Sequence, residues 1–216
     1  VDFIVNKGDK IAFVSKSSVA LTHFFEILAG NIQADSGEFI YGTTISTAYL
    51  PNENHSFFEE KLPLIDWLRQ YAQTDEEKEE VYLRTFLGRM LFTGEEAMKT
   101  ANVLSGGERR RTEIARCLAS DPNFILLDEP FAGVDPIAVE DIQNIVAHLK
   151  DRNIGILITD HDVQATLAIT DKTYLMYNGS ILKEGTPEEL AADEMVRKVY
   201  LGKEFELKRK KQSRLF

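Results

Sequence analysis

The sequence predicts an α/β fold, built on a mixed or parallel sheet with a small helical segment inserted in the chain. Two apolar runs, residues 124–127 and 154–159, carry this prediction because each has the length of a strand buried on both faces. The first run ends in Asp128-Glu129 and the second in Asp160-His161. Since parallel sheets bind their ligands outside the carboxyl ends of the strands, we expect a functional site at this edge.

Composition places the chain among globular proteins with a substantial core. It has 216 residues, 44% of them hydrophobic, enough for one large domain or two small ones. No run has the length and apolarity of a transmembrane helix, and no signal peptide is visible. The single cysteine, Cys117, cannot form an internal disulfide, and the net charge of −10 argues against non-specific nucleic-acid binding. We expect a cytoplasmic protein, and the start at Val1 without a methionine suggests a piece of a longer chain.

Strand signals precede and follow a short helix in the first fifty residues. The helix is expected over residues 23–29 and is closed by Gly30, the usual residue after a helix C-terminus. A loop, residues 15–22, separates the helix from the strand before it. The predicted strands cover residues 1–5, 10–14, 38–40 and 45–50, with a turn at 6–9.

The middle of the chain, residues 62–103, has a helical pattern. Leu64, Leu68 and Tyr71 keep a spacing of three to four residues, and Trp67 among them is expected in the core. The acidic run 74–80 is expected to be a solvated loop or helix start.

The second half of the chain alternates helices with strands. A glycine-bearing turn at 104–108 precedes a helix over 109–119, with Ile114, Ala115 and Leu118 on one face. An amphipathic helix is expected over 137–150 and a shorter one over 163–169. A hairpin around Asn178-Gly179, final helices opening at residue 186 and a solvated basic tail at 208–211 complete the prediction.

Five sequence words in a fixed order resemble the ATP-binding cassette (ABC) ATPases. They are LSGGE, an arginine-rich helix, ILLDEP, a Gly-Val-Asp turn and ITDH. The resemblance implies a P-loop NTPase fold and a single ABC ATPase domain over residues 1–216. Within it, the nucleotide-binding core is expected at 1–54 and 105–190, a helical subdomain at 55–104, and a C-terminal helix with the basic tail at 191–216.

The segment that would form the phosphate loop departs from the family pattern. A phosphate loop has the pattern G-x-x-x-x-G-K-[ST], but Ser15 and Ala20 stand at the glycine positions and Leu21 at the lysine position. Glycines let such a loop bring N–H groups close to phosphate, and the lysine contacts the β and γ phosphates. Only Thr22, the expected magnesium ligand, matches. We therefore expect weak ATP binding, or binding without efficient turnover, by Ser15, Lys16, Ser17, Ser18, Val19, Ala20, Leu21, Thr22 and His23.

The other site residues follow from the resemblance to cassettes that work as head-to-tail pairs. Ser105, Gly106, Gly107 and Glu108 would face the γ-phosphate held by a partner cassette, and Asp135 would couple the two sites. Asp128 would hold Mg²⁺ together with Thr22 and Asn52, which stands where cassettes carry a glutamine. An ordinary turn asparagine is an equal alternative for Asn52. The resemblance makes Glu129 and His161 catalytic: Glu129 would polarise the attacking water, and His161 would orient Glu129.

The two halves of the chain resemble different subgroups of the family. The segment around LIDWLRQY and VYLRTFLGRMLF resembles the second cassette of the ABC-F translation and resistance factors, which act on ribosomes. From GERRRTEIARCLA onward the chain is similar to the ATPase subunits of lipopolysaccharide exporters, which energise membrane permease subunits. A natural recombinant, an engineered hybrid and an assembly error all remain open.

Three functions follow from these resemblances. The first, which we favour, is an exporter ATPase on the cytoplasmic face of the inner membrane. The second is a fragment of a ribosome-associated factor. The third is a degenerate cassette that dimerises without hydrolysing ATP.

Overall fold

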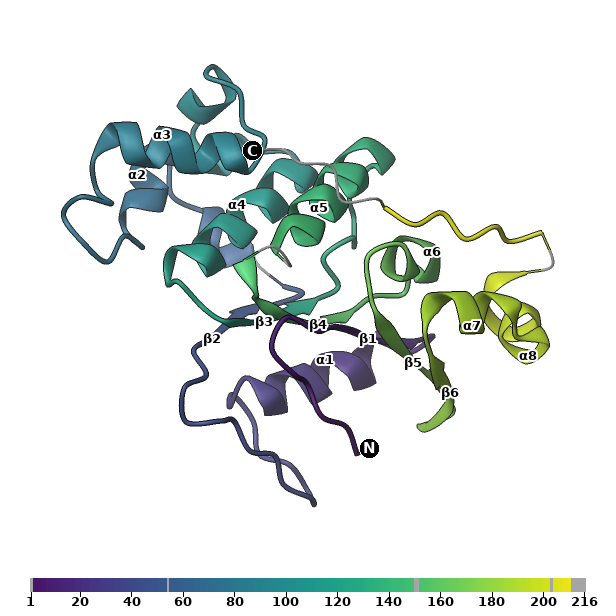
Figure 1. The fold of residues 1–216 in the computed structure, drawn as a ribbon. Helices are drawn as coiled ribbons and strands as arrows, with labels where there is room; N and C mark the ends of the chain where they lie inside the picture. Colours follow the sequence, from purple (N-terminus) through teal and green to yellow (C-terminus); the bar gives the residue numbers. More distant parts are fainter. Residues whose placement is uncertain (1, 54, 150–151, 203, 211–216) are drawn as a thin grey trace.

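A six-stranded sheet forms the centre of the molecule (Figure 1). The computed structural model describes residues 2–53, 55–149, 152–202 and 204–210. The strand order is β2-β3-β4-β1-β5-β6, and every neighbouring pair is parallel except β5 and β6. The predicted α/β fold with a mixed or parallel sheet is therefore confirmed, and the sheet is mixed and mostly parallel. The strands are β1 (Lys10–Ser15), β2 (Thr47–Leu50), β3 (Phe124–Asp128), β4 (Gly155–Thr159), β5 (Lys172–Tyr177) and β6 (Ser180–Gly185).

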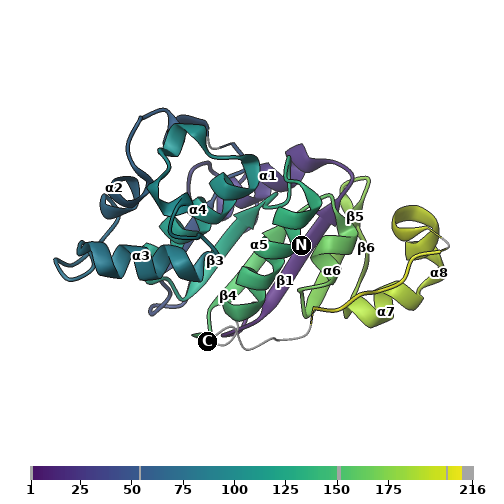
Figure 2. The ribbon, with the colours of Figure 1, turned by 90° about the horizontal axis from the view of Figure 1, so that it is seen from above.

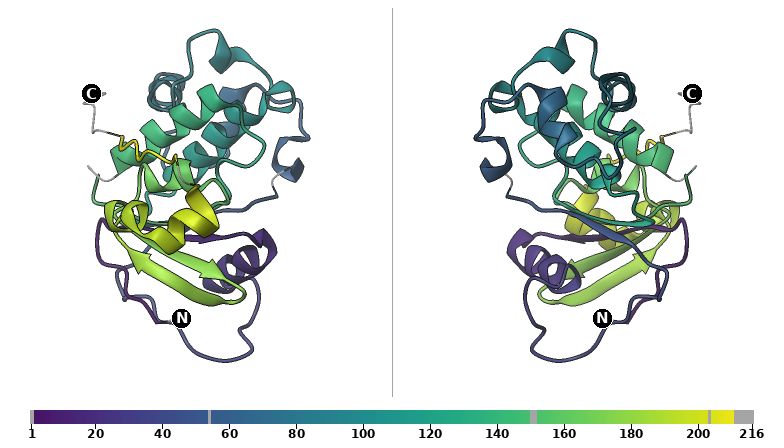
Figure 3. Two further views of the ribbon diagram at one scale, coloured as in Figure 1. Left: turned by 90° about the vertical axis from the view of Figure 1, so that its right-hand side faces the viewer. Right: turned by 90° about the vertical axis from the view of Figure 1, so that its left-hand side faces the viewer.

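Helices cover both faces of the sheet, so that α1 lies on one face and α4, α5 and α6 on the other (Figures 1 and 3). Side chains alternate along each strand between two cores. Leu126 and Leu157 join the core under α1, whereas Leu127 and Ile158 join the larger core under α4 and α5. The longer helices are α1 (Ser18–Leu28), α2 (Leu64–Arg69), α3 (Glu80–Arg89), α4 (Gly106–Ala119), α5 (Pro136–Leu149), α6 (Val163–Leu167) and α7 (Pro187–Ala192).

A group of short helices lies beside α4, seen from above in Figure 2. It contains α2, α3 and three single turns, His55–Phe58, Glu96–Met98 and Ala101–Val103. Trp67 is its centre, because the indole is 1% exposed, stacks on Phe58 at 5.0 Å and donates from Nε1 to the Phe57 carbonyl at 2.7 Å. The prediction of Trp67 as a core residue is confirmed.

Three local predictions for the first half of the chain are wrong. Residues 2–5 and 38–40 form no strand, since no neighbouring segment among the described residues pairs with them; Val1 lies outside that part of the chain. The helix predicted at 23–29 begins five residues earlier, at Ser18. Its C-terminal glycine is confirmed, because Gly30 has a φ of 80°.

The end of the described chain, residues 204–210, packs against the protein, so the predicted solvated tail is wrong for Arg209 and Lys210. Arg209 donates to the carbonyl oxygens of Leu167 and Thr170 at the end of α6. Lys210 pairs with Glu140 on α5 at 2.5 Å. These carbonyls have no further helical turn to bond, so a cationic side chain there is favourable. Lys211 lies outside the described residues. The final helices are α7, α8 (Glu194–Val196) and a wider turn, Arg197–Leu201.

Candidate active site

Asp128 and Glu129, at the end of β3, lie beside Asp160 and His161, which follow β4. The two strands are adjacent and parallel, and their register pairs Asp128 with Thr159. The residues that follow each strand therefore lie side by side. His161 Nδ1 is 2.6 Å from Glu129 Oε2 and 3.5 Å from Asp160 Oδ1. Glu129 has a φ of 52°, an unusual value for a residue other than glycine and typical of functional sites.

Asp128 is fully buried, and its carboxylate accepts several hydrogen bonds. Its Oδ1 accepts from Thr159 Oγ1 at 2.7 Å and from Thr22 Oγ1 at 3.3 Å, and the N–H of Asn52 also donates to this carboxylate. Burial raises the pKa of Asp128, whereas the hydrogen bonds from Thr159 and Thr22 lower it and the charge of Glu129 raises it further. Thr22, Asn52 and Asp128 are thus brought together from α1, the loop after β2 and the end of β3.

Tyr49 is a member of this cluster that sequence reasoning missed. Its hydroxyl donates to Glu26 Oε1 at 2.8 Å and lies 3.4 Å from Asp128 Oδ2. Burial, and then the hydrogen bond with Glu26, raise the pKa of Tyr49. The hydroxyl therefore stays protonated and ties the carboxylate to α1. No local pattern marks Glu26 or Tyr49, because the three residues are 23 and 79 positions apart.

The second missed residue is Asp160, which is fully buried behind His161. Its oxygens accept from the N–H groups of Phe131 at 2.9 Å and Asp162 at 2.8 Å. Burial raises the pKa of Asp160 to about 7, opposed by these two hydrogen bonds and supported by the nearby charge of Glu129. The hydrogen bond with Glu129 raises the pKa of His161, whose side chain is 62% exposed. The position of Asp160 directly after a buried strand was the available signal.

The eroded phosphate loop is mostly helix. β1 ends at Ser15 and α1 begins at Ser18, so only Lys16 and Ser17 connect them. Leu21 is 1% exposed and packs in the core under the sheet, at the position where a lysine would face phosphate. The Leu21 side chain therefore cannot supply the charged contact of a phosphate-loop lysine.

The remaining loop residues have local roles. Ser15 Oγ accepts from the N–H of Ser17 at 3.1 Å, and the Lys16 ammonium lies over the ring of Tyr200 at 5.6 Å. Ser18, Val19 and Ala20 form the first turn of α1, with Val19 65% exposed. His23 Nδ1 bonds the carbonyl of Val19 at 2.8 Å, inside the same helix. Of the nine residues, Thr22 alone bonds the acid cluster among the described contacts.

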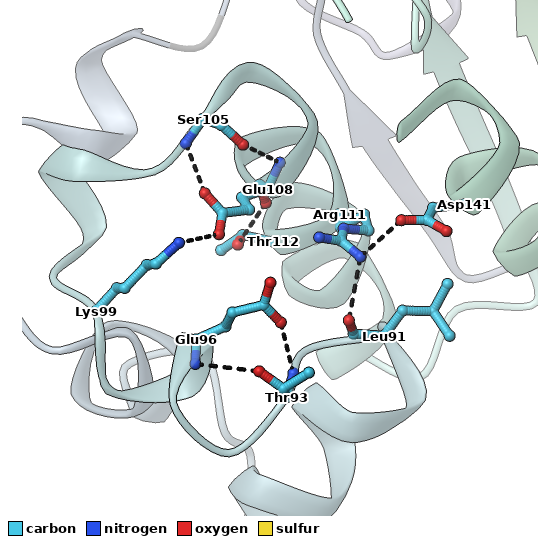
Figure 4. Close-up of polar contacts among 9 residues, drawn as sticks. All are labelled: Leu91, Thr93, Glu96, Lys99, Ser105, Glu108, Arg111, Thr112 and Asp141. Atoms are coloured by element: carbon cyan, nitrogen blue, oxygen red, sulfur yellow. Dashed lines mark hydrogen bonds and ion pairs between the residues drawn. The ribbon is translucent and has the colours of Figure 1, made fainter. Parts of the chain in front are cut away.

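The donor-rich turn before α4 has a helix-capping arrangement (Figure 4). The N–H of Glu108 donates to Ser105 Oγ, and the N–H of Ser105 donates to Glu108 Oε2. Lys99 binds the other oxygen of Glu108 at 2.6 Å. Burial acts to raise the pKa of Glu108, but the bonds from Lys99 and Ser105 outweigh it, and the net shift is downward. Glu108 therefore stays ionised and holds the start of α4.

Gly106 and Gly107 allow two parts of the chain to approach closely. A Cβ on Gly106 would lie 2.9 Å from the carbonyl oxygen of Gly133, and one on Gly107 would lie 2.2 Å from the Cβ of Ala138. α4 is therefore packed directly on the turn that carries Asp135. Asp135 itself caps α5, since its Oδ1 accepts from the N–H groups of residues 137 and 138.

Arg110, also missed by sequence reasoning, joins α4 to the loop after β2. Its guanidinium is buried and donates to the carbonyls of Pro51 at 3.0 Å and Asn52 at 2.9 Å. Glu113 on the same helix balances its charge at 3.2 Å. The backbone of Asn52 is therefore fixed between Arg110 and Asp128.

This fold and this cluster define an α/β protein with an acid pair at the end of a central strand. The chain belongs to the ABC transporter family, whose family profile matches residues 1–132. It is thus an ABC cassette with the P-loop α/β fold.

Two curated relatives cover nearly the whole chain. The Bacillus subtilis protein YkpA, an uncharacterised ABC transporter ATP-binding protein, is 40% identical over 92% of the chain. The Escherichia coli lipopolysaccharide export ATP-binding protein LptB is 37% identical over 96% of it. The chain spans 36% of YkpA and 91% of LptB.

The fold is also similar to that of solved cassettes. The dimeric cassette MJ0796 bound to ADP and Pi superposes with a TM-score of 0.71 over 87% of this chain and 89% of that one, at 18% identity. At that identity the likeness extends to the fold alone. None of the described helices has the length and apolarity needed to cross a membrane.

Proposed function

We propose that this chain energises a membrane exporter of the lipopolysaccharide type by binding and hydrolysing ATP between two head-to-tail cassettes. The supporting observation is the likeness to LptB, which extends over 96% of this chain and 91% of that protein. The partners would be a second cassette, either an identical or a different chain, and permease subunits in the membrane. The chain would then work at the cytoplasmic face of the inner membrane.

The oxygen atoms around Asp128 are of the kind that would bind magnesium. Mg²⁺ prefers oxygen ligands, which the Asp128 carboxylate and the Thr22 hydroxyl would supply, with the side-chain oxygen of Asn52 proposed as a third. Thr22 Oγ1 lies 3.3 Å from Asp128 Oδ1, so these two proposed ligand atoms are already close together. When bound, the ion would neutralise charge on the phosphate oxygens.

Glu129 is the group suited to accept a proton from water. Its Oε2 is held by His161, while its Oε1 is buried and has no hydrogen-bond partner among the described residues. A free acceptor oxygen on an oriented carboxylate suits the activation of an attacking water. His161 fixes the orientation of Glu129 and presents an exposed ring towards solvent, where the γ-phosphate would lie.

The partner-facing surface would be the start of α4. Ser105, Gly106 and Gly107 would present a hydroxyl and N–H groups to the γ-phosphate of the partner's nucleotide, and an N-terminal helix turn favours an anion. The packing of Gly106 on Gly133 would link this contact to Asp135 in the same chain.

A second candidate is a ribosome-associated factor of the ABC-F type. It is motivated by the resemblance of the segment before Ser105 and by YkpA, of which this chain spans 36%, leaving room for a second cassette. Affinity purification of the tagged chain separates the two candidates. Recovery of membrane permease subunits is expected, and recovery of ribosomes without permeases would replace the exporter proposal.

A further inference from the structure

Among the described residues, no lysine or arginine side chain is recorded as pairing with the acid cluster of Asp128, Glu129 and Asp160. Asp128, Glu129 and Asp160 are each at most 1% exposed at neighbouring strand ends. Among the described contacts, the only side chain that can pair with them as a cation is His161. Leu21 fills the place of a lysine, and buried carboxylates without a cation are costly. The cluster is therefore suited to attract a cation.

Three of these side chains place possible metal-ligand atoms close together. Glu129, Asp160 and His161 each offer one ligand atom, and these atoms lie within 4.8 Å of one another. An independent observation points in the same direction: Oε1 of Glu129 has no hydrogen-bond partner among the described residues, although this side chain is 98% buried. The N–H groups of Phe131 and Asp162 hold Asp160 in place.

We propose that Glu129, Asp160 and His161 form a binding site for a transition-metal dication such as Zn²⁺. Two carboxylate oxygens and one imidazole nitrogen are ligands that Zn²⁺ and Co²⁺ accept, whereas Mg²⁺ prefers oxygen alone. The site is distinct from the magnesium donors, because Thr22 bonds Asp128 and not this group. The exposed ring of His161 gives an ion access from solvent.

An ion at this site would compete with ATP hydrolysis. It would occupy the lone pair that Glu129 needs for water and would fix His161 against it. Binding of the metal does not rest on the proposed function, since it needs neither nucleotide nor turnover. It can therefore be tested on the nucleotide-free chain.

The experiment is a titration of the purified, nucleotide-free chain with Co²⁺, followed by visible absorption and by displacement with Zn²⁺. One Co²⁺ per chain is expected. Loss of a direct ligand should weaken binding by about 10-fold or more, because even groups that only support a ligand are worth that much. His161→Ala is the primary variant, since an exposed side chain can be removed without unfolding the protein. Glu129→Gln keeps the shape of its side chain and should weaken binding as well.

Two controls decide the outcome. His148→Ala changes a histidine on α5 that bonds within its own helix and should leave Co²⁺ affinity unchanged. Thr22→Val should also leave it unchanged. Equal affinity in wild type and His161→Ala would overturn the proposal, as would binding that only Thr22→Val abolishes. Absence of Co²⁺ and Zn²⁺ binding to the folded wild-type chain would overturn it too.

Discussion

The ends of β3 and β4 differ from the end of the neighbouring strand β1. At the ends of β3 and β4, Thr159 bonds both Asp128 and the N–H of Glu129, and His161 bonds the Glu129 carboxylate. At the end of β1, one strand away, two residues connect the strand to α1, which starts earlier than the family pattern predicts. The difference shows that the local structure at each strand end depends on its own local sequence.

The first prediction tests Glu129 at the end of β3 and has the largest expected effect. Glu129→Gln removes the proton acceptor and leaves its size unchanged, so ATP turnover should fall about 100- to 10,000-fold. Steady-state phosphate release measures it, and the same variant should retain ATP-dependent dimers in size-exclusion chromatography. If the parent chain has no turnover above this variant, the non-hydrolysing cassette becomes the better description.

The second prediction concerns a variant in which the phosphate-loop pattern is restored at residues 15–22. Leu21→Lys alone would bury a charge in the core, so the change should be combined with Ser15→Gly and Ala20→Gly, which favour a loop. Charge-assisted bonds from the lysine should tighten ATP binding about 10- to 100-fold. A calorimetric titration measures it, with the two glycine changes alone as the matched control. Equal, tight affinity in the parent and the repaired chain would contradict our account of the loop.

The prediction of the fold succeeded where local sequence decides the structure. The runs that became β3 and β4 are apolar throughout, and the Asn178-Gly179 turn joins β5 to β6 with φ values of 48° and 79°. The start of α1 was predicted wrongly because the family pattern implied a loop. Without glycines, Ser18, Val19 and Ala20 adopt helix instead.

Tyr49 and Arg110, two of the missed site residues, were missed for one physical reason. Tyr49 meets Asp128, and Arg110 meets Asn52, across 79 and 58 positions of sequence. Such pairs are created by strand order and helix packing, which no local periodicity encodes. Asp128 and Glu129 were identifiable because they follow a buried strand, and Thr22 because it alone matches the loop pattern.

The third prediction concerns the close approach between α4 and α5. Gly107→Ala would place a methyl group 2.2 Å from the Cβ of Ala138, so the helices must separate. Overpacking of this kind should lower the free energy of unfolding by about 1–3 kcal/mol. Urea unfolding measures it. The matched control is Gly88→Ala in α3, where a Cβ meets nothing within 4 Å and helix propensity should raise stability by up to about 1 kcal/mol.

The last prediction concerns pH and has the smallest effect, because His161 is exposed to solvent. The hydrogen bond with Glu129 raises the pKa of His161 in the folded protein. A histidine with a raised folded pKa binds more protons when folded, so its contribution to stability is complete below the unfolded pKa of about 6.5 and is lost as pH rises through the folded value. The stability difference between wild type and His161→Ala should therefore be larger at pH 6 than at pH 9. Urea unfolding at both pH values tests this, and a difference that grows with pH would mean that His161 is neutral when it binds Glu129.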